Sequence, residues 1–142
     1  MNEDIELLNY IYQNAKMGIV GIDNIKSSIK DKNFLKLINE QENDYYEICT
    51  KAIKYLSLYD SERENISIMA KTMTFLDAKT KLMKDNSVSQ MAKMMIEGNN
   101  KGIIEITEKL NNYKDASKQV IKIAKNLLKI EELNLENLKK YL

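Results

Sequence analysis

The chain contains no proline and only four glycines in 142 residues. An average protein of this length would contain about seven prolines and about ten glycines. The tight turns of β-sandwiches and α/β folds depend on these residues. The background is rich in Lys, Glu, Ile and Leu, a composition that suits helices. We therefore expect an all-α protein.

Apolar residues recur with the period of a helix along the whole chain. The length fits one domain, residues 1–142, with a single hydrophobic core. Two of the expected helices open with a capping box, in which Ser is followed three residues later by Glu or Gln. The expected helices cover about residues 3–30, 33–58, 61–84, 87–112 and 115–142.

Two segments of the chain are similar to each other, which indicates a diverged duplication. Residues 13–22 match residues 97–106 when Gly18 is aligned with Gly102, and a second long helix follows each segment. Only a short turn separates the first two helices, so they should be antiparallel neighbours. We expect two helical hairpins, with the helix at 61–84 as the crossover between them.

The fifth expected helix contains Glu131, Glu132, Leu133 and Asn134 on an amphipathic pattern that continues to Leu138. This stretch resembles the Glu-x-x-His motif of the ferritin-like superfamily, which includes rubrerythrins and several spore-coat proteins of low-GC bacteria, with Asn134 in place of the histidine. The layout of the chain is similar to that superfamily as well. The resemblance implies a ferritin-like four-helix bundle with an additional crossover helix.

The resemblance also implies a place for a di-iron site, made by one Glu from each first helix and a Glu-x-x-His from each second helix. The isolated Glu positions fall near Asn14 and Gly98, and the inward positions of the second helix are Gln41 with Asp44 or Tyr45. Neutral amides cannot balance the charge of two divalent ions. We therefore expect no di-iron centre, no other metal and no cofactor. We expect a polar core layer made by Glu131, Asn134, Gln41, Tyr45 and Asn14.

Glu131 has two interpretations. It could be a residual metal ligand or proton acceptor, or it could be an inward carboxyl group that is hydrogen-bonded within the polar layer. A buried carboxylate must be paired or neutralised, and a layer of Gln, Tyr and Asn side chains offers partners. The sequence favours the second interpretation.

All four glycines fall inside expected helices, where each costs about 0.5–1 kcal/mol relative to Ala. One interpretation is a ligand pocket lined by backbone. The favoured interpretation is close packing between the first and fourth helices. The residues concerned are Gly18, Gly21, Gly98 and Gly102.

Charge and composition exclude several classes of function. The 22 basic and 21 acidic residues nearly cancel and Arg63 is the only arginine, so we expect no nucleic-acid partner. Histidine is absent and Cys49 is the only cysteine, which removes disulfides, Cys-His nucleophiles and most zinc sites. The N-terminus is acidic and leads into no long apolar stretch, so we expect a cytoplasmic protein without a membrane partner.

The sequence thus favours a non-enzymatic structural or interaction module, which would act as a homo-oligomer or with a protein partner. A role in a spore coat or a stress response is implied by the resemblance alone. Two alternatives stay open. One is a carboxylate-only metal-binding or iron-handling protein that uses Glu131, Glu97 and a Glu of the second helix. The other is a carrier of a small apolar ligand, bound beneath the four glycines and the methionines of the expected helices, which are Met69, Met73, Met83, Met91, Met94 and Met95.

Overall fold

The computed structural model describes residues 2–59 and 86–142. These residues form helices, with one short turn inside each of the two ranges and no strand among them. This confirms the all-α prediction for the described part of the chain. The expected crossover helix at 61–84 lies outside the described residues. The helices are α1 (Asn2–Lys26), α2 (Lys32–Leu58), α4 (Val88–Asn112) and α5 (Lys118–Lys139).

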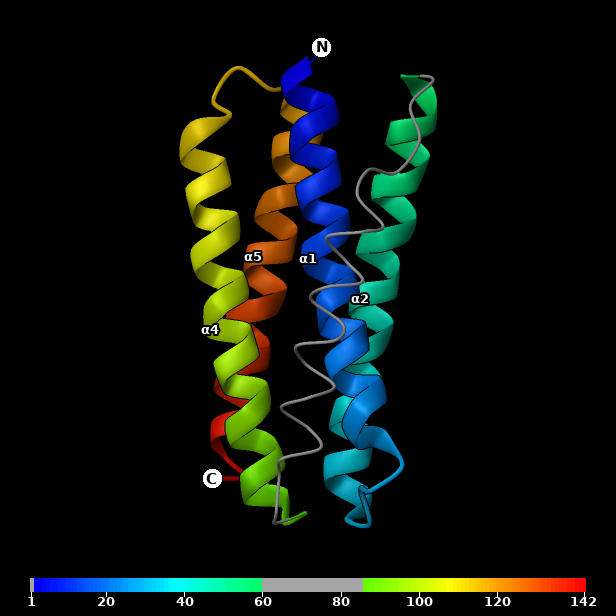
Figure 1. The fold of residues 1–142 in the computed structure, drawn as a ribbon, viewed down its shortest axis with the longest axis vertical. Helices are drawn as coiled ribbons and strands as arrows, with labels where there is room; N and C mark the ends of the chain where they lie inside the picture. Colours follow the sequence, from blue (N-terminus) through cyan, green and yellow to red (C-terminus); the bar gives the residue numbers. More distant parts are fainter. Residues whose placement is uncertain (1, 60–85) are drawn as a thin grey trace.

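The four helices lie side by side as two antiparallel hairpins, α1 with α2 and α4 with α5 (Figure 1). Across the two hairpins, α1 packs against α4 and α5, and α2 packs against α5. Helices α2 and α4 run in the same direction, while α1 and α4 run in opposite directions (Figure 1). The end of α2 and the start of α4 therefore lie at opposite ends of the helical bundle.

Three side chains set the starts of α2, α4 and α5. Asp31 accepts a hydrogen bond from the backbone of Phe34, and Ser87 and Ser117 each accept one from the backbone three residues later. Such caps satisfy an N–H group that has no partner in the first helical turn. The Ser87 cap is at the predicted position, whereas α5 begins after Ser117 and not near Asp115.

The first helix ends at Lys26, four residues before its predicted end at Lys30. Ser27 and Ser28 form a turn here, and the N–H of Ser28 donates to the carbonyl of Ile25 at 2.9 Å. Serine competes for backbone hydrogen bonds and favours turns over helix interiors. Two consecutive serines therefore end a helix that the apolar periodicity alone would continue.

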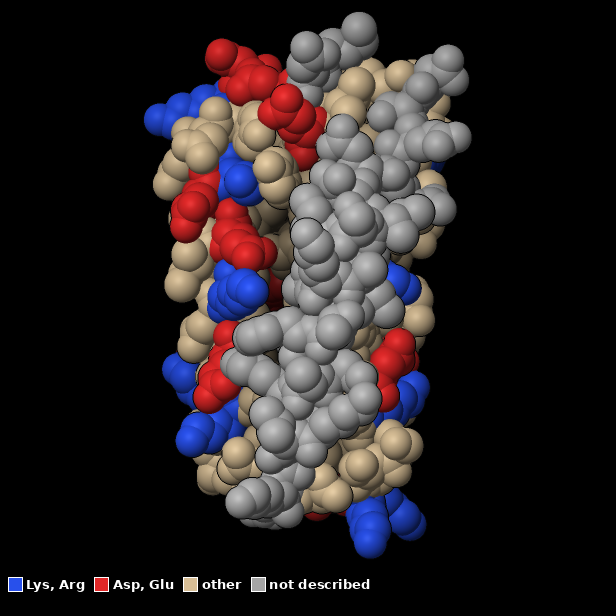
Figure 2. Space-filling view, in the orientation of Figure 1, with Lys and Arg blue, Asp and Glu red and all other residues tan. Residues whose placement is uncertain are grey.

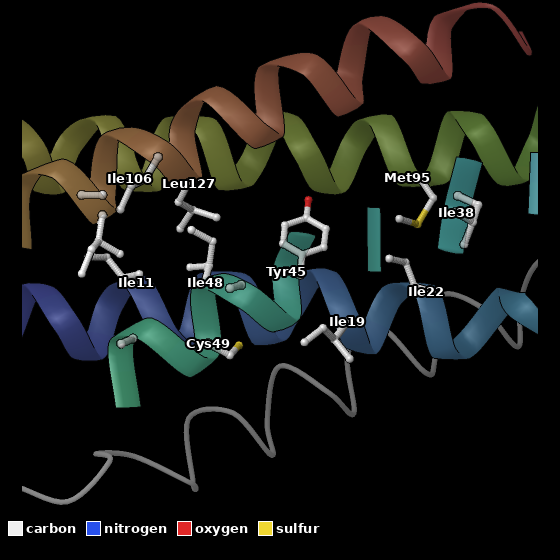
Figure 3. Close-up of a cluster of buried hydrophobic side chains, with 14 of the residues drawn as sticks. Ile11, Ile19, Ile22, Ile38, Tyr45, Ile48, Cys49, Met95, Ile106 and Leu127 are labelled. Atoms are coloured by element: carbon white, nitrogen blue, oxygen red, sulfur yellow. The ribbon is translucent and has the colours of Figure 1, made fainter. Parts of the chain in front are cut away.

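Apolar side chains from all four helices form one core, and Figure 3 shows its middle section. Tyr45 lies at the centre of this view, with apolar side chains along the bundle on both sides of it. Burial of each Ile, Leu or Met side chain contributes about 1.5–3 kcal/mol to the free energy of folding. Ile11, Ile48, Ile106 and Leu127 lie on one side of Tyr45, and Ile19, Ile22, Ile38 and Met95 lie on the other.

At one end of the fold, the buried Asp4 joins the ends of three helices. Its carboxylate accepts a hydrogen bond from the hydroxyl of Tyr59, the residue that follows α2. It accepts another, at 2.6 Å, from the backbone N–H of Ser117, the residue that precedes α5. Burial raises the pKa of Asp4, but these hydrogen bonds outweigh it and leave the pKa below its ordinary value. The ionised carboxylate is therefore the form that holds α1, α2 and α5 together here.

None of the four described helices has an apolar stretch long enough to cross a membrane.

We predict that Asp4→Asn lowers the free energy of unfolding at pH 7 by about 1–3 kcal/mol, since a charged acceptor of two hydrogen bonds is lost. Because folding lowers the pKa of Asp4, its stabilisation is present above the unfolded pKa of about 3.9 and is lost as the pH falls through the folded pKa. The difference from wild type should therefore shrink below about pH 4. Urea unfolding between pH 7 and pH 2 measures it.

Glu136→Gln is the control, because Glu136 forms an exposed ion pair with Lys139 at 2.9 Å. Such pairs contribute about 0–1 kcal/mol. Equal stability of the two variants at pH 7 would show that Asp4 does not hold the helix ends.

Candidate buried polar site

The five residues of the predicted polar layer are all buried, with at most 6% of each exposed. Asn14 comes from α1, Gln41 and Tyr45 come from α2, and Glu131 and Asn134 come from α5. On each second helix the two residues are separated by about one turn, so they lie on the same face. The amphipathic periodicity predicts inward positions for Gln41, Tyr45, Glu131 and Asn134, and all four are buried. Asn14 is expected here from the resemblance alone, and it is buried as well.

Helix α4 contributes Asn99, a buried residue that the sequence reasoning missed. The predicted inward position was its neighbour Gly98, which is exposed. One residue along a helix is a rotation of about 100°, so the two side chains point in different directions. The missed signal was helical spacing, because Asn99 lies four residues after Met95 and three before Gly102, both of which are buried.

Two hydrogen bonds tie α4 to the other hairpin. The Tyr45 hydroxyl donates to Oδ1 of Asn99 at 2.9 Å, and Figure 3 shows this hydroxyl pointing toward α4. Nδ2 of Asn14 donates to the backbone carbonyl of Gly102 at 3.0 Å. Residues 45 and 14 belong to α2 and α1, so both helices of the first hairpin contact α4 through the polar layer. We call Asn14, Gln41, Tyr45, Asn99, Glu131 and Asn134 the central polar layer.

Gly18 and Gly102 occupy equivalent places in the two hairpins. A Cβ atom at Gly18 would lie 2.5 Å from Cε2 of the Tyr45 ring, and a Cβ atom at Gly102 would lie 2.7 Å from the carboxyl carbon of Glu131. In each case the large side chain comes from the second helix of the same hairpin. This equivalence agrees with the alignment of Gly18 with Gly102 in the proposed duplication.

The prediction was close packing between the first and fourth helices, whereas the side chains that meet Gly18 and Gly102 come from the other helix of the same hairpin. The Gly102 carbonyl does also accept the hydrogen bond from Asn14 of α1. Gly18 makes room for a side chain of α2, and Gly102 makes room for a side chain of α5. Gly21 does face α4, but a Cβ atom there would make an ordinary contact with the Met95 sulfur at 3.7 Å. The prediction is wrong for Gly98, because it is exposed and has open space around it.

We predict that Gly18→Ala lowers the free energy of unfolding by about 1–3 kcal/mol, because the new methyl group overlaps a buried ring. Gly102→Ala should also destabilise, since it displaces the Glu131 carboxyl group. Gly98→Ala should instead stabilise by about 0.5–1 kcal/mol, because alanine suits a helix and meets nothing there. Chemical denaturation compares the three variants. A gain in stability for all three would refute the close contacts.

Glu131 is the only carboxyl group in the central polar layer. Burial raises its pKa well above the ordinary value, and the nearby Glu105 of α4 raises it further. Burial also raises the pKa of Tyr45, and Glu131 adds to this shift, while Asn134 opposes it. Burial therefore favours the protonated, uncharged form of both acids.

We predict that Glu131→Gln gains stability relative to wild type as the pH rises above about 4.3, the ordinary pKa of Glu. Above that pH the unfolded chain loses this proton while folded Glu131, beside Tyr45 and Glu105, keeps it. Wild type therefore loses stability as the pH rises toward the folded pKa, by at most about 1.4 kcal/mol per pH unit. Glutamine has no such proton, so the difference should grow with pH. Urea unfolding between pH 4 and pH 8 measures it.

Glu132→Gln is the matched control, because Glu132 is the exposed neighbour of Glu131. We expect it to follow the wild-type pH profile. A constant difference between Glu131→Gln and wild type across this range would show that Glu131 ionises alike in both states.

The carboxylates required for the carboxylate-only metal alternative are not brought together. Glu97 is exposed, whereas Glu131 is buried. On α2, Glu40 is exposed and Glu42 forms an ion pair with Lys26 at 2.8 Å. Among residues 2–59 and 86–142 there is no group of three or more acidic, Cys or His side chains arranged to hold a metal ion.

Cys49 of α2 is buried in the hydrophobic core of the bundle. Burial raises the pKa of this thiol to about 11, so the thiolate that acts as a nucleophile is disfavoured. This environment is typical of an inert, structural cysteine.

Comparisons with family models, with curated proteins and with solved structures give no significant match to this chain.

Proposed function

We propose that this protein is a ferritin-like helical bundle that works as a structural or interaction module, with a neutral polar layer in place of a di-iron centre. The helix directions support this proposal. Two antiparallel hairpins are arranged so that α2 and α4 run the same way (Figure 1), which requires the long connection that ferritin-like bundles use between their hairpins.

The composition of the central polar layer carries the proposal. One residue comes from the first helix of each hairpin, Asn14 and Asn99, and two come from each second helix. This distribution follows the ferritin-like scheme, but the donor set does not fit two divalent ions. It offers one carboxyl group with a raised pKa, several neutral amides and a phenol. A di-iron site needs several carboxylates and imidazoles with supporting hydrogen bonds.

A structural or interaction role also fits the surface. Acidic and basic side chains are interspersed over the coloured part of the face shown in Figure 2, which supports a protein partner or a second copy over a nucleic acid. A cytoplasmic location agrees with the single, buried cysteine.

We predict that protein purified from a culture supplemented with iron and manganese contains well under one equivalent of either metal. The reason is that Glu131 is the only carboxyl group of the layer, and metal binding would have to displace its proton. Metal analysis of wild type and Glu131→Gln measures this. Stoichiometric metal in wild type that disappears in Glu131→Gln would contradict the proposal and favour an iron-handling protein.

Native mass spectrometry of the same preparation separates the remaining alternative. A homo-oligomer, or a monomer with its unmodified mass, agrees with a structural or interaction module. A stoichiometric apolar molecule that copurifies with the chain would favour a carrier.

A further inference from the structure

The central polar layer contains buried polar atoms that have no hydrogen-bond partner. Among the described residues, six of the seven side-chain atoms in this condition belong to the layer. They come from all four helices, so the condition is a shared property of the layer and not of one side chain. The atoms are Oδ1 of Asn14, Nε2 and Oε1 of Gln41, Nδ2 of Asn99, Oε2 of Glu131 and Nδ2 of Asn134.

Such atoms are costly to leave unpaired. A buried donor or acceptor without a partner destabilises a fold by about 1–3 kcal/mol, and most buried polar groups in proteins are hydrogen-bonded to protein or to ordered water. Six atoms in this condition would remove much of the stability of a small domain. The layer therefore points to a bound molecule that supplies the missing hydrogen bonds.

The chemistry of the six atoms defines that molecule. Three are amide nitrogens, which need acceptors, and the others are oxygens of amide or carboxyl groups. A cation would bind the oxygens but leave the N–H groups of Asn99 and Asn134 without acceptors. An anion would leave the oxygens of Asn14 and Gln41 without donors, and the nearby Glu105 would oppose its charge. A small neutral molecule that both donates and accepts satisfies the whole set.

We infer that the central polar layer is a binding site for buried water. Water both donates and accepts, and a buried water makes about three hydrogen bonds to protein. About two such waters would satisfy the six atoms. They would connect Asn14 of α1, Gln41 of α2, Asn99 of α4 and Glu131 of α5 through one network. This inference goes beyond the proposed function and does not depend on it, because it rests on unpaired atoms and not on the resemblance.

Water-¹⁷O magnetic relaxation dispersion tests the inference, because it detects waters that stay bound for longer than nanoseconds. We compare wild type with Gln41→Leu, which removes two of the six atoms. The matched control is Met95→Leu, a conservative change in the adjacent apolar core. We expect a dispersion from about two long-lived waters in wild type, a clear loss in Gln41→Leu and no change in Met95→Leu.

A second measurement on wild type alone keeps the test decisive if Gln41→Leu does not fold. Cross-relaxation from water to the side-chain NH₂ groups of Asn99 and Asn134 should be observed by NMR at neutral pH. Absence of this signal, equal dispersion in wild type and Gln41→Leu, or a stoichiometric ion or organic molecule in the layer would each overturn the inference.

Discussion

The contact of a large polar side chain with a glycine of the same hairpin is the constraint on which the centre of this structure depends. The ring of Tyr45 lies against Gly18, and the carboxyl group of Glu131 lies against Gly102. Any side chain at either glycine would occupy space that these groups already fill. The helical glycines are intrinsically destabilising, and the close contacts that they allow explain why Gly18 and Gly102 suit their positions.

The central polar layer also explains how the two hairpins stay in register. Apolar side chains on both sides of Tyr45 can pack in several ways, since apolar contact has little directional preference. The hydrogen bonds from Tyr45 to Asn99 and from Asn14 to Gly102 have fixed geometry. A slide or rotation of α4 would break both bonds and leave polar groups buried without partners, which is unfavourable. The layer therefore selects one arrangement among those that the apolar core would allow.

Much of the fold was predictable from the sequence, and the reasons for the errors are physical. The shortage of proline and glycine and the 3.6-residue period correctly indicated helices with inward Tyr45 and Glu131. The error at Gly98 arose because neighbouring residues differ by about 100° around a helix axis. The partners of Gly18 and Gly102 could not be predicted, because the presence of glycine indicates a close approach without identifying what approaches. The hydrogen bond between Asp4 and Ser117 could not be predicted either, because the two residues are 113 positions apart in the chain.

The two hairpins place chemically different groups in equivalent positions, a phenol at Tyr45 and a carboxylic acid at Glu131. Burial raises the pKa of both groups, so both are favoured in forms that can donate a hydrogen bond. In a charged layer the helices would have to bury an uncompensated ion, which is far more costly than burying a neutral donor. A di-iron site has the opposite requirement, because its carboxylates must be ionised to bind the metals. The central polar layer contains a single carboxyl group, so protonation of Glu131 is enough to leave the layer without a buried charge.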